Sequence, residues 1–314
     1  MAVTVDPRRA ARRRAFCADV SHESSESLAA TASRVDHWIL VEYRGLWDRD
    51  VLGGSLLSAK LKAHLSGQLA ELGHARLLFV KKPERRSYGR RQLYFGSSRP
   101  GAERFFALEF DRHDDLVGFD FAGALAGEET PGVPVDHPLF VVCTHGKRDR
   151  CCAKHGRPLY DALRRGAWSE WVWQSTHVGG DRFAGNVVVL PEGLFYGRVL
   201  PDETAGLLDE HSRRRLLLER YRGRSTFAFP VQAAEHALRV EEGLAGIADL
   251  DYAGGERVGA GATWRVRFRD QDGVVHEVDV VEELAEEPTY LTCGATVPQR
   301  ARRFTAIARR VLNP

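Results

Sequence analysis

The chain has 314 residues, of which 43% are hydrophobic and 28% are charged, and its formal net charge is +2 at neutral pH. Because basic and acidic residues are balanced and interspersed, the composition gives no signal for a nucleic-acid or membrane-surface partner. No apolar run approaches the roughly 18 residues of a membrane span, and the length predicts two or three domains.

The first 34 residues are rich in Arg, Ala, Ser and Glu without a clear period, so we interpret 1–34 as a basic N-terminal arm that can contain a short helix. The run Arg8–Arg14 is not followed by an apolar segment, which argues against a secretory signal. A solvated, frayed arm is the simplest interpretation, with nucleic-acid contact or targeting as alternatives.

Residues 35–130 predict a strand, a helix, a second strand and a hairpin, in that order. The helix pattern is amphipathic and stops at Gly73, a residue typical of helix ends. The elements are expected at Trp38–Tyr43, Leu56–Leu72, Ala75–Val80, Gln92–Gly96 and Arg104–Phe110.

A stretch rich in glycine and proline, Gly127–Pro138, predicts a boundary, and residues 131–230 then repeat the same order with a final long helix. The expected elements are Leu139–Cys143, Pro158–Arg165, Glu170–Gln174, Asn186–Leu190, Leu194–Val199 and Pro201–Arg222. Both halves therefore predict a thioredoxin-like α/β sandwich, the first of them as a degenerate copy. Four leucines are expected on or beside the buried face of the long helix: Leu207, Leu216, Leu217 and Leu218.

Residues 231–314 predict a small α+β domain. A helix after Val231 leads into two alternating segments, Thr263–Phe268 and Val274–Val281, which flank Asp-Gln-Asp-Gly and are typical of an antiparallel hairpin. A last helix is expected to close the chain near Val311.

The cysteines are odd in number and unevenly placed, at positions 17, 143, 151, 152 and 293. In a chain without an export signal, this favours a reducing cytoplasm and metal or redox chemistry over structural disulfides. Cys293 lies near a predicted strand end and could face a redox loop or a partner, although a small packing cysteine is the ordinary case. Cys17 lies in the N-terminal arm, and its position gives even less indication of a functional role.

Two pairs of potential ligands stand out in the second half. Cys143 ends a predicted strand and Cys152 precedes a predicted helix, positions where α/β folds bind ligands and where a helix N-terminus favours thiolate. His177 and Asp181 bracket a Gly-Gly turn, whose backbone can approach a ligand closely. Soft donors that converge from loops are what an iron–sulfur cluster requires, and both Cys and His can serve.

The surrounding sequence resembles a known family. Three blocks resemble the thioredoxin-like [2Fe-2S] ferredoxins. They are Cys-x8-Cys, the overlapping Cys-Ala-x-x-Gly and, at 186–199, Asn-Val-Val-Val-Leu-Pro-Glu-Gly-Leu-Phe-Tyr-Gly-Arg-Val. The blocks Cys-Thr-His-Gly and His-x-Gly-Gly-x-Arg-Phe-Ala-x-Asn narrow the resemblance to the sucrase/ferredoxin-like family, over about 138–225. The resemblance implies that residues 131–230 form a thioredoxin-like ferredoxin domain.

The same resemblance implies a [2Fe-2S] cluster ligated by Cys143, Cys152 and His177. At the fourth position this chain has Asp181 where the family has histidine, and a carboxylate is a harder donor that should lower the reduction potential. Three alternatives stay open: Asp181 is the ligand, Cys151 replaces it, or the cluster is absent. Cys151 is also expected as a packing cysteine, because neighbouring side chains in an extended loop point to opposite sides.

Several neighbours are candidates for shaping the charge around such a cluster. His145, two residues after Cys143, is either a hydrogen-bonding partner of the site or an ordinary loop histidine. Arg148 and Arg182 could donate to the cluster or screen its charge, and local salt bridges are the alternative. Gly179 and Gly180 would supply backbone N–H groups.

The function predicted from these residues is electron transfer, so an electron carrier is favoured over an enzyme, with an unknown redox protein as its partner. One alternative is a thiol-based redox protein that uses Cys143 as nucleophile near His145. Another is an interaction protein on the same scaffold, either metal-free or with zinc on Cys143, Cys152, His177 and Asp181. No carboxylate pair can be assigned to glycoside chemistry, so a sucrase activity is not predicted.

Overall fold

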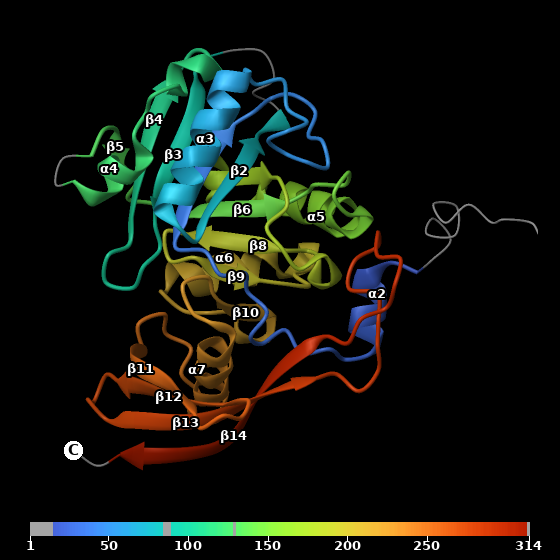
Figure 1. Ribbon diagram of the computed structural model, residues 1–314, viewed down its shortest axis with the longest axis vertical. Coiled ribbons are helices and arrows are strands. Elements are labelled where there is room, and N and C mark those ends of the chain that lie inside the picture. Colours follow the sequence, from blue (N-terminus) through green and yellow to red (C-terminus); the bar gives the residue numbers. More distant parts are fainter. Residues whose placement is uncertain (1–14, 84–88, 128–129, 313–314) are drawn as a thin grey trace, which may run out of the picture.

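The computed structural model describes residues 15–83, 89–127 and 130–312, and the predicted arginine-rich run Arg8–Arg14 lies outside them. Figure 1 shows one large sheet with helices on its outside, and a smaller sheet that packs against α7 near the C-terminus. The large sheet has ten strands in the order β10-β9-β8-β6-β7-β2-β1-β3-β4-β5, and the small one has four. Among the described residues, no helix is both long and apolar enough to cross a membrane.

The first half of the large sheet has the order β2-β1-β3-β4. Strands β1 and β2 are parallel, whereas β3 is antiparallel to both β1 and β4. The strands are β1 His37–Glu42, β2 Ala75–Lys81, β3 Arg91–Ser97 and β4 Arg104–Phe110, followed by the short β5 Val133–Pro134. Every residue of β1 is buried, as expected for a parallel strand that is covered on both faces.

The second half has the same arrangement, with the order β9-β8-β6-β7. Strands β6 and β7 are parallel, and β8 is antiparallel to both β6 and β9. The strands are β6 Leu139–Cys143, β7 Val172–Ser175, β8 Val187–Leu190, β9 Leu194–Tyr196 and β10 Tyr221–Arg224. The predicted thioredoxin-like α/β fold class is confirmed, whereas the domain boundaries stay a prediction.

The two halves join through their equivalent second strands, since β2 pairs antiparallel with β7 at Val80 and Ser175. The combined sheet is curled, because the rings of Trp38 in β1 and Phe195 in β9 lie 6.1 Å apart although four strands separate β1 from β9 in the sheet. The inside of this curl is a shared core that includes Cys143 and Cys152. The candidate ligands therefore lie where the two halves meet.

Helices cover the outside of the curl. In the first half α3 packs Leu61 and Leu65 against Ile39 of β1, and its Ser58 cap accepts a hydrogen bond from the N–H of Leu61. In the second half α5 and α6 pack on the opposite side of β6 from the shared core. The helices are α2 Cys17–Glu23, α3 Ala59–Leu72, α4 Phe121–Ala126, α5 Arg150–Leu163, α6 Thr204–Ser212 and α7 Phe229–Glu242.

The helix predicted at Pro158–Arg165 begins eight residues earlier, at Arg150. Asp149 caps it by accepting a hydrogen bond from the N–H of Cys151, and the helix then continues through Pro158. The sequence-based prediction began the helix at Pro158 because proline is typical of a first helical turn. Cys151 and Cys152 therefore lie on the first turn of α5, and not in an extended loop.

The long helix predicted at Pro201–Arg222 is wrong in its second half. Helix α6 ends at Ser212, and the chain then turns so that the N–H of Leu216 bonds to the carbonyl of Ala245. The remainder forms a short 3₁₀ turn and strand β10, so tertiary pairing overrides the helical propensity of this arginine- and leucine-rich stretch. Of the four leucines, two are buried, Leu207 and Leu216.

In the C-terminal part, the hairpin predicted after Val231 and α7 is confirmed as β12 and β13. The helix predicted near Val311 is wrong, because this segment is a strand that pairs along its length with β13. Its alternating residues Phe304 and Ala306 pack against the core below α7, which a helix could not do in that register. The four strands are β11 Leu250–Val258, β12 Thr263–Asp270, β13 Val275–Leu284 and β14 Arg302–Leu312.

Candidate metal centre

Cys143 and Cys152 enter the candidate site from two regular elements that pack together. Cys143 is the last residue of β6 and Cys152 the third residue of α5, and each is only 1% exposed. The N-terminus of a 14-residue helix carries a partial positive charge, which favours thiolate at both positions.

Gly156, one turn after Cys152, sets the distance between α5 and β6. A Cβ at this position would overlap the carbonyl oxygen of Cys143, so glycine is needed for the helix to approach the strand this closely. The close approach brings the two thiols to a common point.

We therefore expect Gly156→Ala to push α5 away from β6, to cost about 1–3 kcal/mol of unfolding free energy and to reduce metal binding by the thiols. Gly67→Ala is the matched control, because Gly67 also lies within a 14-residue helix and its Cβ would meet no other described atom within 4 Å. The control should stabilise the protein by about 0.5–1 kcal/mol. Denaturant unfolding of both variants measures these changes in free energy. Equal unfolding midpoints for Gly156→Ala and Gly67→Ala would contradict the packing argument.

His177 and Asp181 reach the same point from the loop after β7. The ligand atoms of Cys143, Cys152 and His177 all lie within 4.8 Å of one another. Nδ1 of His177 is 3.7 Å from Sγ of Cys152 and 3.0 Å from Oδ1 of Asp181, which itself is 3.8 Å from the same sulfur. The structure thus brings Cys143, Cys152 and His177 together, and Asp181 contacts two of these three, Cys152 and His177.

A buried arginine holds this loop in place. Arg222 in β10 is 1% exposed and donates to the carbonyl of Gly179 at 3.1 Å and to Oδ1 of Asn186 at 2.8 Å. The Asn186 amide in turn donates to the carbonyl of Gly180, at 2.8 Å. Gly179 and Gly180 have φ values of 104° and 80°, which other residues rarely adopt. Asn186 is thus part of the loop's support.

The pKa values of the two thiols are shifted in opposite directions. The hydrogen bond with Cys152, aided by His177, holds the pKa of Cys143 well below its usual value, whereas the same bond raises the pKa of Cys152. Burial lowers the pKa of His177, but its interactions with Cys143 and Asp181 together outweigh burial, and the net shift is upward. Burial raises the pKa of Asp181. These shifts favour the thiolate form at Cys143 more than at Cys152.

The other predicted neighbours have different roles. His145 is buried and packs edge-on against Trp47, with ring centroids 5.9 Å apart. Arg182 pairs with Glu26 at 2.8 Å, a salt bridge to the N-terminal segment 156 positions away and not the local one considered from the sequence. Arg148 is exposed, and its charge partly opposes the rise that burial causes in the pKa of Asp181.

Cys151 faces away from this set. Its sulfur lies 3.5 Å from that of Cys17 and 3.4 Å from that of Cys293, and together with Asp149 these residues form a second group of possible metal ligands. Neither Cys17 nor Cys293 was assigned a site from the sequence. The signal that pointed to them was weak: they and Cys151 are the cysteines left over after the Cys-x8-Cys pair.

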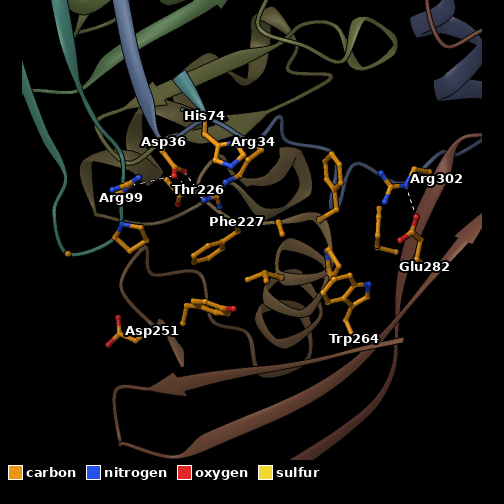
Figure 2. A pocket seen from close by; sticks show the side chains of 18 residues that line it. Arg34, Asp36, His74, Arg99, Thr226, Phe227, Asp251, Trp264, Glu282 and Arg302 are labelled. Atoms are coloured by element: carbon orange, nitrogen blue, oxygen red, sulfur yellow. Dashed lines mark hydrogen bonds and ion pairs between the residues drawn. The ribbon is translucent and has the colours of Figure 1, made fainter. Parts of the chain in front are cut away.

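A separate hollow of about 980 Å³ lies beside α7 (Figure 2). Aromatic rings such as Phe227 and Trp264 line it, and its Arg302 is paired with Glu282. None of the 18 lining residues is a predicted ligand. The hollow therefore shares no residue with the two cysteine groups.

Comparison with known proteins matches residues 28–223 to the Sucrase/ferredoxin-like family. Two curated relatives are both named "Altered inheritance of mitochondria protein 32". The one from Meyerozyma guilliermondii is 37% identical over 95 residues, covering 27% of this chain and 34% of that protein. The one from Debaryomyces hansenii is 35% identical over 81 residues, covering 23% and 30%. The chain thus spans about a third of the length of the curated relatives it matches.

Among solved structures, the wild-type thioredoxin-like [2Fe-2S] ferredoxin from Aquifex aeolicus is 18% identical with a TM-score of 0.22, covering 25% of this chain and 88% of that one. A further structure of a thioredoxin-like [2Fe-2S] ferredoxin from the same organism is 16% identical with a TM-score of 0.25, covering 29% and 94%.

Proposed function

Because this chain belongs to the sucrase/ferredoxin-like family, we propose that it is an electron-transfer protein in which Cys143, Cys152 and His177 hold a [2Fe-2S] cluster. The observation that carries the proposal is the convergence of these three ligand atoms within 4.8 Å of one another, from three separate segments of a buried core. Such a cluster, when bound, exchanges single electrons.

The residues present suit this group chemically. Two thiols and an imidazole are soft donors, and mixed Cys and His ligation is known from Rieske centres. The N-terminus of α5 and the guanidinium of Arg222 place positive charge near the thiolates, and the pKa of Arg222, lowered by burial to about 9, leaves it charged at neutral pH. Positive charge near the cluster favours its reduced form and so raises the reduction potential.

We assign Asp181 as the fourth ligand. Its carboxylate already contacts the Cys152 sulfur and the His177 ring, and it is almost fully buried. For both His177 and Asp181 to bind metal, the 3.0 Å contact between them must be exchanged for two metal bonds. Proton loss from the imidazole Nδ1 accompanies that exchange.

Asp181→His tests this assignment and should restore the ligand pattern of the family. We expect the cluster to remain and its reduction potential to rise by on the order of 100 mV, because imidazole is a neutral and softer donor than carboxylate. A redox titration followed by visible absorption measures the change. If the potential is unaltered while Cys151→Ser bleaches the protein, Cys151 is the fourth ligand instead.

One observation favours a second candidate, a single zinc ion at the same four residues. Donors around one tetrahedral zinc ion lie about 3.3–3.8 Å apart, given Zn–S bonds of about 2.3 Å and Zn–N or Zn–O bonds of about 2.0 Å. The separations of 3.7 Å and 3.8 Å from the Cys152 sulfur to His177 and Asp181 agree with this spacing, whereas the 3.0 Å contact between His177 and Asp181 is shorter. The protein would then be a zinc-bound interaction protein.

A thiol enzyme is less well supported, since Cys143 is 1% exposed and a nucleophile must be reached by its substrate. Of the four residues, His177 has the most exposed side chain, at 21%. An electron partner, which we propose to be another protein, would therefore dock over His177.

The deciding experiment is anaerobic purification of the full chain, followed by visible absorption spectroscopy and assays of iron, acid-labile sulfide and zinc. We expect visible charge-transfer bands and equal amounts of iron and sulfide. A colourless protein without iron or sulfide would overturn the electron-transfer proposal, and zinc that depends on Cys143 would then support the second candidate.

A further inference from the structure

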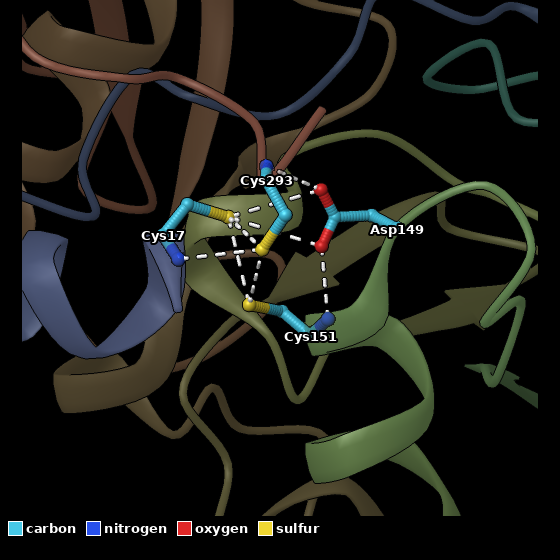
Figure 3. Close-up of side chains that lie close together, drawn as sticks. All are labelled: Cys17, Asp149, Cys151 and Cys293. Atoms are coloured by element: carbon cyan, nitrogen blue, oxygen red, sulfur yellow. Dashed lines mark hydrogen bonds between the residues drawn. The ribbon is translucent and has the colours of Figure 1, made fainter. Parts of the chain in front are cut away.

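Three cysteines and an aspartate meet at a second buried point, outside the site described above (Figure 3). Cys17 begins α2, Cys151 lies in the first turn of α5, and Cys293 lies in the connection between β13 and β14. The Cys17 sulfur lies 3.5 Å from that of Cys151 and 3.6 Å from that of Cys293, and the third separation is 3.4 Å. Both carboxylate oxygens of Asp149 are 3.9 Å from the Cys17 sulfur.

This arrangement is neither a disulfide nor ordinary packing. A disulfide has an S–S distance of about 2.05 Å and uses two sulfurs, whereas here three sulfurs form a nearly equilateral triangle. The surrounding apolar cluster is small, and the fully buried members apart from cysteine are Ala18 and Ala184. Hydrophobic packing of such small residues gives no reason for three sulfurs to be placed in mutual contact.

The spacing is instead that of ligands around one tetrahedral ion. Zn–S bonds of about 2.3 Å at the tetrahedral angle place sulfurs about 3.8 Å apart, and a Zn–O bond of about 2.0 Å gives an S–O edge of about 3.5 Å. The observed S–S separations of 3.4–3.6 Å and S–O separations of 3.9 Å are close to these values.

The geometry points to a structural zinc site formed by Cys17, Cys151, Cys293 and Asp149. Three thiolates are soft donors that select zinc, copper(I) or iron, and the hard carboxylate disfavours copper(I). The four residues are largely buried and would fill all four positions of a tetrahedral ion with protein ligands, which is the arrangement of structural zinc.

Backbone groups prepare these residues for an ion. The N–H of Ala18 points to the Cys151 sulfur at 3.4 Å and the N–H of Cys17 to the Cys293 sulfur at 3.5 Å, which stabilises negative charge on both sulfurs. Asp149 accepts hydrogen bonds from the N–H groups of Cys151 at 2.8 Å and Cys293 at 2.7 Å. Each carboxylate oxygen keeps a second lone pair, so these bonds leave room for a metal bond.

The ion would connect segments that are far apart in the chain. Cys17 and Cys293 are separated by 276 positions, and Figure 1 shows the β13–β14 connection running beside α2. Between Leu284 and Arg302 this connection contains a single isolated bridge, Thr289 to Gln299, among the described residues. A metal bridge would therefore fix the connection and α2 against the first turn of α5.

The test is metal analysis of the anaerobically purified full chain, in its wild-type form and in two variants, Cys293→Ser and Cys143→Ser. We expect about one zinc per chain at this site, an at least tenfold loss of zinc in Cys293→Ser, and retention in Cys143→Ser. Iron and sulfide should show the opposite dependence, so failure of the cluster and failure of the zinc site are distinguishable. If the first site also holds zinc, each variant should lose about half of the total.

Cobalt(II) provides a second readout that does not depend on the metal acquired in the cell. After chelation and reconstitution, Cys143→Ser, which lacks a ligand of the first site, should show the intense visible bands of tetrahedral cobalt with thiolate ligands, and the double variant Cys143→Ser/Cys293→Ser should not. Circular dichroism checks that the variants are folded. If Cys293→Ser is unfolded, cobalt titration of Cys143→Ser tests whether the site binds metal.

Three results would overturn the zinc site. The first is a reduced wild-type protein that contains no Cys293-dependent metal and takes up no cobalt. The second is iron, and not zinc, that depends on Cys293. The third is a disulfide between two of the three cysteines, detected by mass spectrometry after thiols are blocked in anaerobic lysate.

Discussion

Cys143→Ser should abolish the visible absorption of the purified protein and remove at least nine-tenths of its iron and sulfide, on the order of the loss expected when a cluster ligand is deleted. The reason is that Cys143 is one of the three convergent ligands, and the hydrogen bond with Cys152 already holds its pKa low. A serine hydroxyl is a hard donor with a much higher pKa, so it replaces a thiolate poorly.

The matched control is the neighbouring thiol. Cys151→Ser changes a residue of the same type one position from Cys152, yet its sulfur faces Cys17 and Cys293. We expect this variant to keep its visible spectrum, iron and sulfide and to lose zinc. Should Cys151→Ser lose the chromophore and Cys143→Ser retain it, the proposed ligand set is wrong.

Arg222→Met should destabilise the protein by about 3–5 kcal/mol, which is a large part of the stability of a typical domain. The side chain is fully buried, and it bridges the carbonyl of Gly179, the side chain of Asn186 and Thr31 in the N-terminal segment. Methionine fills a similar volume but leaves these acceptors without a donor, and each unsatisfied buried group costs about 1–3 kcal/mol. Denaturant unfolding measures the loss.

The same substitution should also lower the metal content of the first site, because the loop that carries His177 loses its support. Arg220→Met is the control, since Arg220 lies two residues away and pairs with Glu203 in a partly exposed salt bridge expected to contribute about 0–1 kcal/mol. Arg222→Lys keeps the positive charge but loses the planar guanidinium with its several N–H donors, so we expect a stability between those of the wild type and Arg222→Met. Equal effects of Arg222→Met and Arg220→Met would refute the proposed role of the buried arginine.

The strand order of each half follows from local patterns that are visible in the sequence. Continuous apolar runs such as Leu139–Cys143 predicted buried strands, and Pro-Glu-Gly between Leu190 and Leu194 predicted the hairpin. The elements that failed were those whose state depends on partners elsewhere. The segment near Val311 is a strand because β13 offers it a free edge, and α6 stops at Ser212 because the following residues pair near Ala245.

The first candidate site was accessible to sequence reasoning because its residues lie within 39 positions in two short motifs, between Cys143 and Asp181. Spacing within a strand–loop–helix unit and a glycine turn is enough to predict that such side chains converge. The support of the loop was not accessible, since Arg222 reaches Gly179 only through the pairing of β10 with β9.

The second group of cysteines was decided by the tertiary structure alone. The sequence determined that Cys17, Cys151 and Cys293 were left over in a chain with little reason for disulfides. Whether they meet depends on how α2 and the β13–β14 connection pack against the N-terminus of α5, and no periodicity reports contacts across 134 or 276 positions. Local patterns determine elements and short motifs, whereas contacts between distant segments arise only when the whole chain has folded.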